Sequence, residues 1–102
     1  MPLTVIKKDE RRETFDREKL KRGIWRASGK TKITAVQIDQ IVEEVEKELI
    51  SGDSTEIKSR NIGELVAKRL KKLDKIAYIR FASVFRQFLD VEDFDKEVKK
   101  LL

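Results

Sequence analysis

The sequence predicts a mainly α-helical α+β domain, in which a small β-sheet of two or three strands caps a bundle of four to five helices. Apolar residues recur every three or four positions after residue 16, and two β-leaning runs flank a polar turn near the N-terminus. The 102 residues are 39% hydrophobic, which suffices for one modest core. We therefore expect a single domain over 1–102, with a hairpin at 4–15 and a helical bundle at 16–102.

The expected hairpin consists of Thr4-Val5-Ile6-Lys7 and Arg12-Glu13-Thr14-Phe15 around the turn Asp9-Glu10-Arg11. A three-residue loop would place Lys7 opposite Glu13 and Val5 opposite Phe15, all on one face. Such a loop favours glycine at its positive-φ position, and Glu10 stands near that position.

The first two helices have clear start signals. Asp16 is a candidate N-cap for a helix over about 16–29, whose buried stripe contains Leu20, Ile24 and Ala27. Thr34-Ala35-Val36-Gln37 is a capping box, and the stripe that follows it ends at Ser51-Gly52-Asp53. The apolar members of that second stripe are Ile38, Ile41, Val42, Val45 and Leu49.

The second half of the chain predicts one strand and three helices. Residues 54–58 are too few for a helix and would add a third strand to the hairpin. Ser59 is a candidate cap for the third helix, 76–89 should form a central helix with an apolar surface on most sides, and Asp90 would cap the last helix. Arg80 and Arg86 need partners if buried, so we expect them to be paired structural arginines. The apolar positions of these helices are Ile62, Leu65, Val66, Leu70 and Leu73, then Ala77, Tyr78, Ile79, Phe81, Ala82, Val84, Phe85 and Phe88, then Val91, Phe94, Val98 and Leu101.

Composition excludes several classes of site. The chain has no cysteine and no histidine, which removes disulfides, zinc sites built from these residues, and catalysis by either. The four glycines are scattered, so no phosphate loop forms, and no constellation suggests an enzyme. No signal peptide or membrane span is apparent, so we expect a cytoplasmic protein.

Charge is distributed unevenly along the chain. Residues 1–32 contain eleven Lys or Arg and five Asp or Glu, whereas 33–102 contain thirteen and fourteen. The positive excess therefore lies in the first third, which suits an anionic partner such as a nucleotide phosphate or a nucleic-acid backbone. A solvated basic surface is the alternative explanation.

Two segments resemble a known family. VIKKDERRETFDREKLKRGIWRA resembles the opening of the ATP-cone, a regulatory nucleotide-binding module with the pattern V-x-K-R-D-G-x-x-E-x-F-D-x-x-K-L. SRNIGELVAKRLKKLDKIAYIRFASVFRQFLDVEDF resembles the ATP-cone of bacterial repressors of ribonucleotide reductase genes more closely than that of the reductases. The resemblance covers about residues 4–97.

The resemblance implies a non-catalytic allosteric domain that binds ATP or dATP, with magnesium as a candidate companion, beneath the small sheet. It also implies an oligomeric state that changes with the nucleotide. By position, Lys7, Lys8 and Lys19 match residues that contact phosphate, and Glu13 matches a residue near the adenine and ribose. The full set of implied nucleotide-binding residues is Val5, Lys7, Lys8, Glu13, Asp16, Lys19, Ser59 and Gly63.

The sequence departs from the family pattern in three places. Glu10 replaces the turn glycine, and Phe85 stands where related repressors commonly have tyrosine. Those repressors carry an N-terminal zinc ribbon with four cysteines that binds DNA, and this chain has no cysteine, so direct DNA binding is not supported. The residues PLTVIKKD resemble the join between ribbon and cone, which favours a regulatory part of such a protein over a stand-alone cone.

Two functional hypotheses follow. The first is the nucleotide-sensing module that changes its self-association or its association with a partner protein. The second is a small basic nucleic-acid-binding domain that uses the N-terminal charge excess, and its affinity would fall steeply with salt. The sequence has few aromatic residues for base stacking and no recognition-helix motif, so the first hypothesis is favoured.

Overall fold

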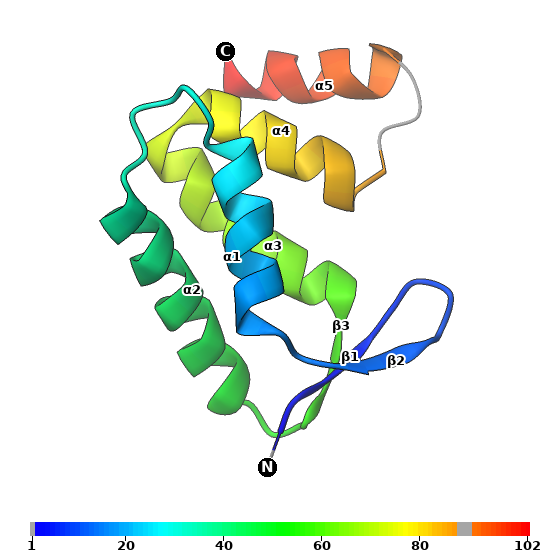
Figure 1. Ribbon diagram of the computed structural model, residues 1–102. Helices are drawn as coiled ribbons and strands as arrows, with labels where there is room; N and C mark the ends of the chain where they lie inside the picture. The colour runs from blue at the N-terminus through cyan, green and yellow to red at the C-terminus, as the bar shows by residue number, and fades with distance from the viewer. Residues whose placement is uncertain (1, 88–90) are drawn as a thin grey trace.

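The computed structural model describes residues 2–87 and 91–102 and confirms the predicted fold class (Figure 1). A three-stranded sheet lies at one end of a helical bundle, and α5 lies across the other end, beside α4 (Figure 1). The elements are β1 (Thr4–Ile6), β2 (Arg12–Thr14), α1 (Arg17–Ala27), α2 (Ala35–Ile50), β3 (Glu56–Lys58), α3 (Ser59–Leu73), α4 (Lys75–Phe85) and α5 (Val91–Leu101).

The sheet has the strand order β2-β1-β3, with β1 antiparallel to β2 and parallel to β3. The predicted third strand is therefore present. Val5 pairs with Ile57; Val5 is buried in the core and Ile57 packs against it. The face that carries these two side chains is turned toward the helices, which matches the alternation of side chains along a strand.

The predicted hairpin register is wrong by two residues. Val5 pairs with Glu13 rather than Phe15, and the Lys7 amide donates to the Arg11 carbonyl oxygen at 2.8 Å. The loop therefore contains residues 8–10, and Glu10 takes the left-handed conformation with φ 71°. The shift moves each pairing by two residues, so Lys7 and Glu13 still share one face.

Local capping explains where the first helices begin. The Asp16 side chain accepts from the Lys19 amide, and Thr34 and Gln37 form the reciprocal capping box, as predicted. The prediction for Ser59 is wrong, because Ser59 is the first residue of α3 and Lys58 occupies the N-cap position without a side-chain hydrogen bond. The chain enters α3 directly from β3, which leaves no separate capping residue.

α4 is shorter than predicted. Asp74 caps it by accepting from the Ile76 and Ala77 amides, and it ends at Phe85. Val84 is 78% exposed, so the apolar surface does not extend around the whole helix. The predicted helical residues Phe88 and Leu89 and the predicted cap Asp90 lie outside the described residues.

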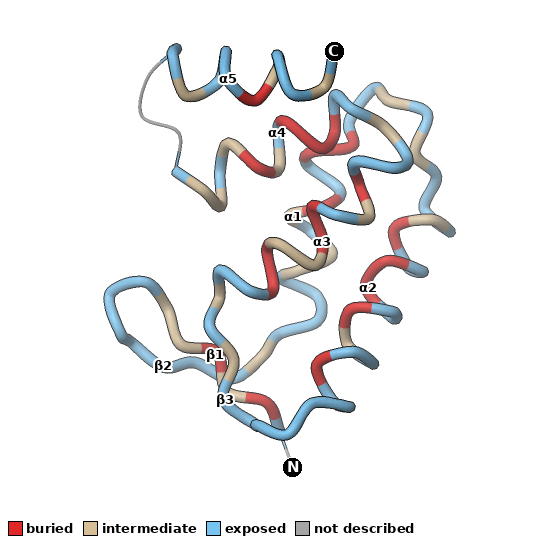
Figure 2. The backbone as a smooth tube through the Cα atoms, turned by 180° about the vertical axis from the view of Figure 1, so that it is seen from behind, coloured by how far each residue is buried: buried red, intermediate tan, exposed pale blue. Residues whose placement is uncertain are grey.

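The core is formed by the facing sides of α1, α2, α3 and α4. Buried segments line the side of α2 that faces α3, while its outer side is exposed (Figure 2). Ile24, Val42, Val66 and Leu70 are fully buried. Within the described part of the chain, no helix has the length and apolar character needed to cross a membrane.

Arg80 within α4 and Arg86 at its C-cap both have structural partners, as predicted. Arg80 donates to the carbonyl oxygens of Ala27 and Gly29 at 3.3 and 2.7 Å, which satisfies acceptors at the C-terminal end of α1. Arg86 makes a bidentate ion pair with Glu64 of α3 at 3.1 and 3.0 Å.

Arg86 also connects α4 to α5. Its guanidinium lies 3.3 Å from the buried Glu97 carboxylate, and Tyr78 donates a hydrogen bond to the same carboxylate. Of the four predicted apolar positions of this helix, Val98 and Leu101 pack against the core, whereas Val91 and Phe94 are exposed. The last helix therefore docks on its own chain through a charged network and one end of its apolar stripe.

A matched pair of glycine substitutions tests the packing of α3 against α4. A Cβ at Gly63 would lie 2.4 Å from Cδ2 of Phe85, whereas a Cβ at Gly23 would meet Phe81 at an ordinary 3.9 Å. Gly63→Ala should lower the free energy of unfolding because overpacking costs about 1–3 kcal/mol, more than the gain of about 1 kcal/mol in helix propensity.

Gly23→Ala should be neutral or stabilising in the same urea titration. Adding Phe85→Leu to Gly63→Ala should recover part of the loss. A Gly63→Ala protein as stable as the Gly23→Ala protein would show that Phe85 does not occupy this position.

The buried carboxylate of α5 should make stability depend on pH. Burial opposes the charge of Glu97, but the hydrogen bond from Tyr78 and the charge of Arg86 outweigh it and hold its pKa below the ordinary value of 4.5. A lowered folded-state pKa means that the stabilisation is present above pH 4.5 and is lost as the pH falls through the folded value.

Glu97→Gln should therefore reduce the free energy of unfolding at pH 7 by about 1–3 kcal/mol, and the gap should narrow in acid. The control is Asp95→Asn, which removes an exposed ion pair with Lys99 and should have little effect at any pH. A gap that stays constant with pH would contradict this assignment.

Candidate functional site

A cluster of opposite charges lies where the sheet meets α1. The Glu13 carboxylate accepts a hydrogen bond from Lys19 Nζ at 3.0 Å, and Lys7 Nζ lies 3.7 Å from the same oxygen. The hydrogen bond from Lys19, with the nearby charge of Lys7, lowers the pKa of Glu13. We call Lys7, Glu13 and Lys19 the sheet-side cluster.

Local structure brings five of the predicted site residues together. Val5 pairs with Glu13 across the hairpin, and Lys7 follows on the same face. The Asp16 cap fixes the first turn of α1, which carries Lys19. Two cationic side chains from different elements thus converge on one carboxylate at an exposed edge of the core.

The N-terminal end of α3 lies beside this cluster. Ile6 pairs with Lys58 in the parallel ladder, so Lys7 and Ser59 are the next residues along two neighbouring strands. No side chain caps α3, in contrast to α1, α2 and α4. Free amide groups at a helix N-terminus, together with the helix dipole, favour an anion.

Lys8 points elsewhere. Its Nζ donates to Gln87 Oε1 at 2.6 Å, just beyond the end of α4. A shallow cavity of about 380 Å³ at the hairpin tip is lined by Lys7, Lys8, Asp9, Arg11 and Gln87. Gln87 could not be predicted as a lining residue, because it is 79 positions from Lys8 and only the fold joins them.

Gly63 lies one turn into α3 and is buried. The Phe85 ring fills the space where a side chain would stand, so Gly63 has a clear packing role. The ring also lies 5.3 Å from the Arg86 guanidinium carbon, so Phe85 is held by an aromatic and charged environment that requires no hydroxyl.

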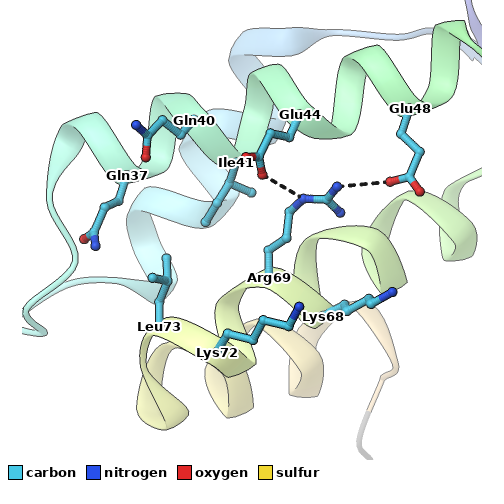
Figure 3. Close-up of a pocket in the computed structure, with 9 residues that line it drawn as sticks. All are labelled: Gln37, Gln40, Ile41, Glu44, Glu48, Lys68, Arg69, Lys72 and Leu73. Carbon is cyan, nitrogen blue, oxygen red and sulfur yellow. Dashed lines mark hydrogen bonds and ion pairs between the residues drawn. The ribbon is translucent and has the colours of Figure 1, made fainter.

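A second hollow lies far from this region, between α2 and α3 (Figure 3). Its volume is about 400 Å³. Arg69 lies across it and donates to Glu44 and Glu48, both at 3.1 Å. Because two carboxylates already neutralise Arg69, this hollow is a poorer site for an anion than the sheet side. It is lined by Gln37, Gln40, Ile41, Glu44, Glu48, Lys68, Arg69, Lys72 and Leu73.

The sheet side is therefore the candidate site. Its two lysines share a single carboxylate, and the neighbouring helix start has no cap. Among the described residues, no group of three acidic, histidine or cysteine side chains is arranged to hold a metal ion. The arrangement suits a polyanion held by amines and backbone amides.

Comparison with known proteins agrees with this geometry. Residues 3–91 match the family described as the ATP cone domain. The chain is 52% identical over 101 residues to a transcriptional repressor NrdR from Caldicellulosiruptor saccharolyticus, covering 99% of this chain and 66% of the relative. It is 46% identical over its whole length to the protein of that name from Acetivibrio thermocellus, covering 68% of the relative.

The chain thus spans about two thirds of the length of these relatives. The matched family segment includes both the sheet-side cluster and the start of α3, and it ends where α5 begins. This chain belongs to the ATP-cone family.

Proposed function

We propose that the chain is a non-catalytic nucleotide-sensing module that binds ATP or dATP on the helix-facing side of its sheet. The convergence of Lys7 and Lys19 on one carboxylate carries this proposal. Two amines beside the positive end of α3 would neutralise a triphosphate, because amines and helix N-termini are both favourable partners for phosphate.

The remaining residues have complementary roles. Lys8 and Arg11 line the cavity at the hairpin tip and would extend the phosphate site outward. Glu13 and Asp16 would lie near the ribose and base, and Val5 and Ser59 would form the walls. Gly63 would act indirectly, since it allows the Phe85 ring to pack close to α3.

Glu13 would serve as an internal substitute for the ligand. In the free protein its carboxylate holds both lysines, and the hydrogen bond from Lys19 lowers its pKa. An arriving triphosphate would compete for the same amines. The displaced carboxylate could then accept hydrogen bonds from ribose hydroxyls, which would link recognition of the sugar to recognition of the phosphates.

We further propose that the bound nucleotide changes the association of the chain with itself and thereby regulates transcription of ribonucleotide reductase genes. The relatives are named transcriptional repressors, which supports a regulatory rather than catalytic role. Measuring molar mass in solution without nucleotide, with ATP and with dATP tests the change in association. An unchanged mass in all three states would refute that part of the proposal.

Calorimetry tests the phosphate site. Lys7→Ala and Lys19→Ala should each weaken ATP and dATP binding roughly tenfold or more, because each removes a charge-assisted contact to phosphate. Lys21→Ala is the matched control, since Lys21 lies on the same helix and pairs with Asp39 at 2.8 Å. If the wild-type chain binds neither nucleotide, with or without magnesium, the proposal fails.

Tripolyphosphate, which has no sugar or base, isolates the role of Glu13. Glu13→Gln should bind tripolyphosphate several-fold more tightly, since the carboxylate no longer competes for Lys7 and Lys19. ATP should gain less, because the variant also loses the carboxylate acceptor for the ribose. Equal gains for both ligands would contradict the exchange of partners.

A further inference from the structure

Four cations on α1 and in the loop after it have no acidic partner in the described part of the chain. Arg17, Lys19 and Lys21 of this helix pair with Glu46, Glu13 and Asp39, respectively. By contrast, no carboxylate in residues 2–87 or 91–102 lies within ion-pair distance of Arg22, Arg26, Lys30 or Lys32. The positive excess of the first third of the chain is therefore concentrated here.

Two of these cations, Arg22 and Arg26, lie on one side of α1, and Lys30 and Lys32 lie in the loop that follows the helix. Arg22 and Arg26 are four residues apart and so lie one above the other, about 6 Å apart along the axis. The opposite side of the helix carries Ile24 and Ala27, which are buried. Arg22 and Arg26 are both exposed, and α1 is drawn in front of α3 in Figure 1.

An exposed aromatic residue lies next to these arginines on the helix surface. Trp25 is 63% exposed, although tryptophan is a costly residue to leave in water. We call Arg22, Trp25, Arg26, Lys30 and Lys32 the outer α1 face. Glu18, one turn before Arg22, is the acidic residue nearest to it along the helix, so the positive charge is uninterrupted from Arg22 onward.

The outer α1 face is separate from the nucleotide site. Lys19 lies in the first turn of α1, next to the sheet, whereas Arg26 lies in the last turn, at the end remote from it. A helix C-terminus favours cations, which accounts for one charge such as Arg26. It does not account for Arg22, Lys30 and Lys32, which also lack an ion-pair partner among the described residues, or for the exposed tryptophan.

We propose that the outer α1 face contacts the phosphate backbone of duplex DNA without reading its sequence. The charge is complementary to a polyanion, and the side of a helix is a convex surface that can lie against the duplex backbone. A single aromatic residue offers no series of stacking positions, so a duplex fits better than a single strand. Trp25, which projects to one side of the two arginines, would cover sugar surface beside the phosphates held by Arg22 and Arg26.

Anisotropy of a labelled 24-base-pair duplex, titrated at several salt concentrations, tests the proposal. The wild-type chain should bind with a dissociation constant of about 10⁻⁴ to 10⁻⁶ M, and the affinity should fall steeply with salt. Arg22→Ala/Arg26→Ala should lower the affinity roughly tenfold and reduce the salt slope by about 2, because two phosphate contacts are lost. Its ATP affinity should be unchanged.

Lys68→Ala/Lys72→Ala is the matched control. It removes the same charge from an exposed pair four residues apart on α3 and should bind the duplex as the wild type does. Equal weakening in both double variants would mean general charge attraction and would overturn the proposal. No binding by the wild type at low salt would overturn it as well.

Trp25 supplies a direct readout because it is the only tryptophan in the chain. Saturation with duplex should quench or shift its fluorescence, and excess single strand should have a weaker effect. An unchanged spectrum at saturation would place the duplex elsewhere. If Trp25→Ala abolishes self-association but leaves duplex binding intact, or if anionic vesicles bind and the duplex does not, the face has a different partner and the proposal is wrong.

Discussion

The parallel pairing of β1 with β3 is the constraint on which the candidate site depends. It joins the N-terminus to the segment between α2 and α3, and the Thr4 amide donates to the Thr55 carbonyl oxygen at 2.8 Å. A two-stranded hairpin alone would be only marginally stable. With the third strand, Lys7 is held beside the start of α3, and Glu13 is held above the first turn of α1.

Features set by neighbouring residues could be predicted from the sequence. The Asp16 cap and the capping box at Thr34 and Gln37 involve atoms three residues apart, so the local pattern defines them. The hairpin was predicted correctly as an element but with the wrong register, because its loop contains residues 8–10, with Glu10 at φ 71° as its last residue, rather than 9–11. A shift of two residues leaves each side chain on the face that was predicted for it, so Lys7 and Glu13 still lie on the same face.

Features that join distant segments could not be predicted in this way. Lys8 meets Gln87, and Glu97 is buried against Tyr78 and Arg86, because the bundle brings separate helices together. The sequence required a partner for Arg86 without indicating which carboxylate would supply it. Similarly, the periodic pattern could not show that Phe85 would fill the space beside Gly63.

The net charge of the chain does not by itself show what each cation does, because the role of a cation depends on the carboxylates that lie beside it. Arg69 and Arg86 are each held by two carboxylates and tie helices together, so they contribute to packing rather than to an external field. Lys7 and Lys19 share Glu13 and can exchange it for another anion. Arg22 and Arg26 have no such partner among the described residues, so their field extends into solvent, where only salt screens it. Three different physical roles thus arise from the same residue types, and pairing, rather than composition, distinguishes them.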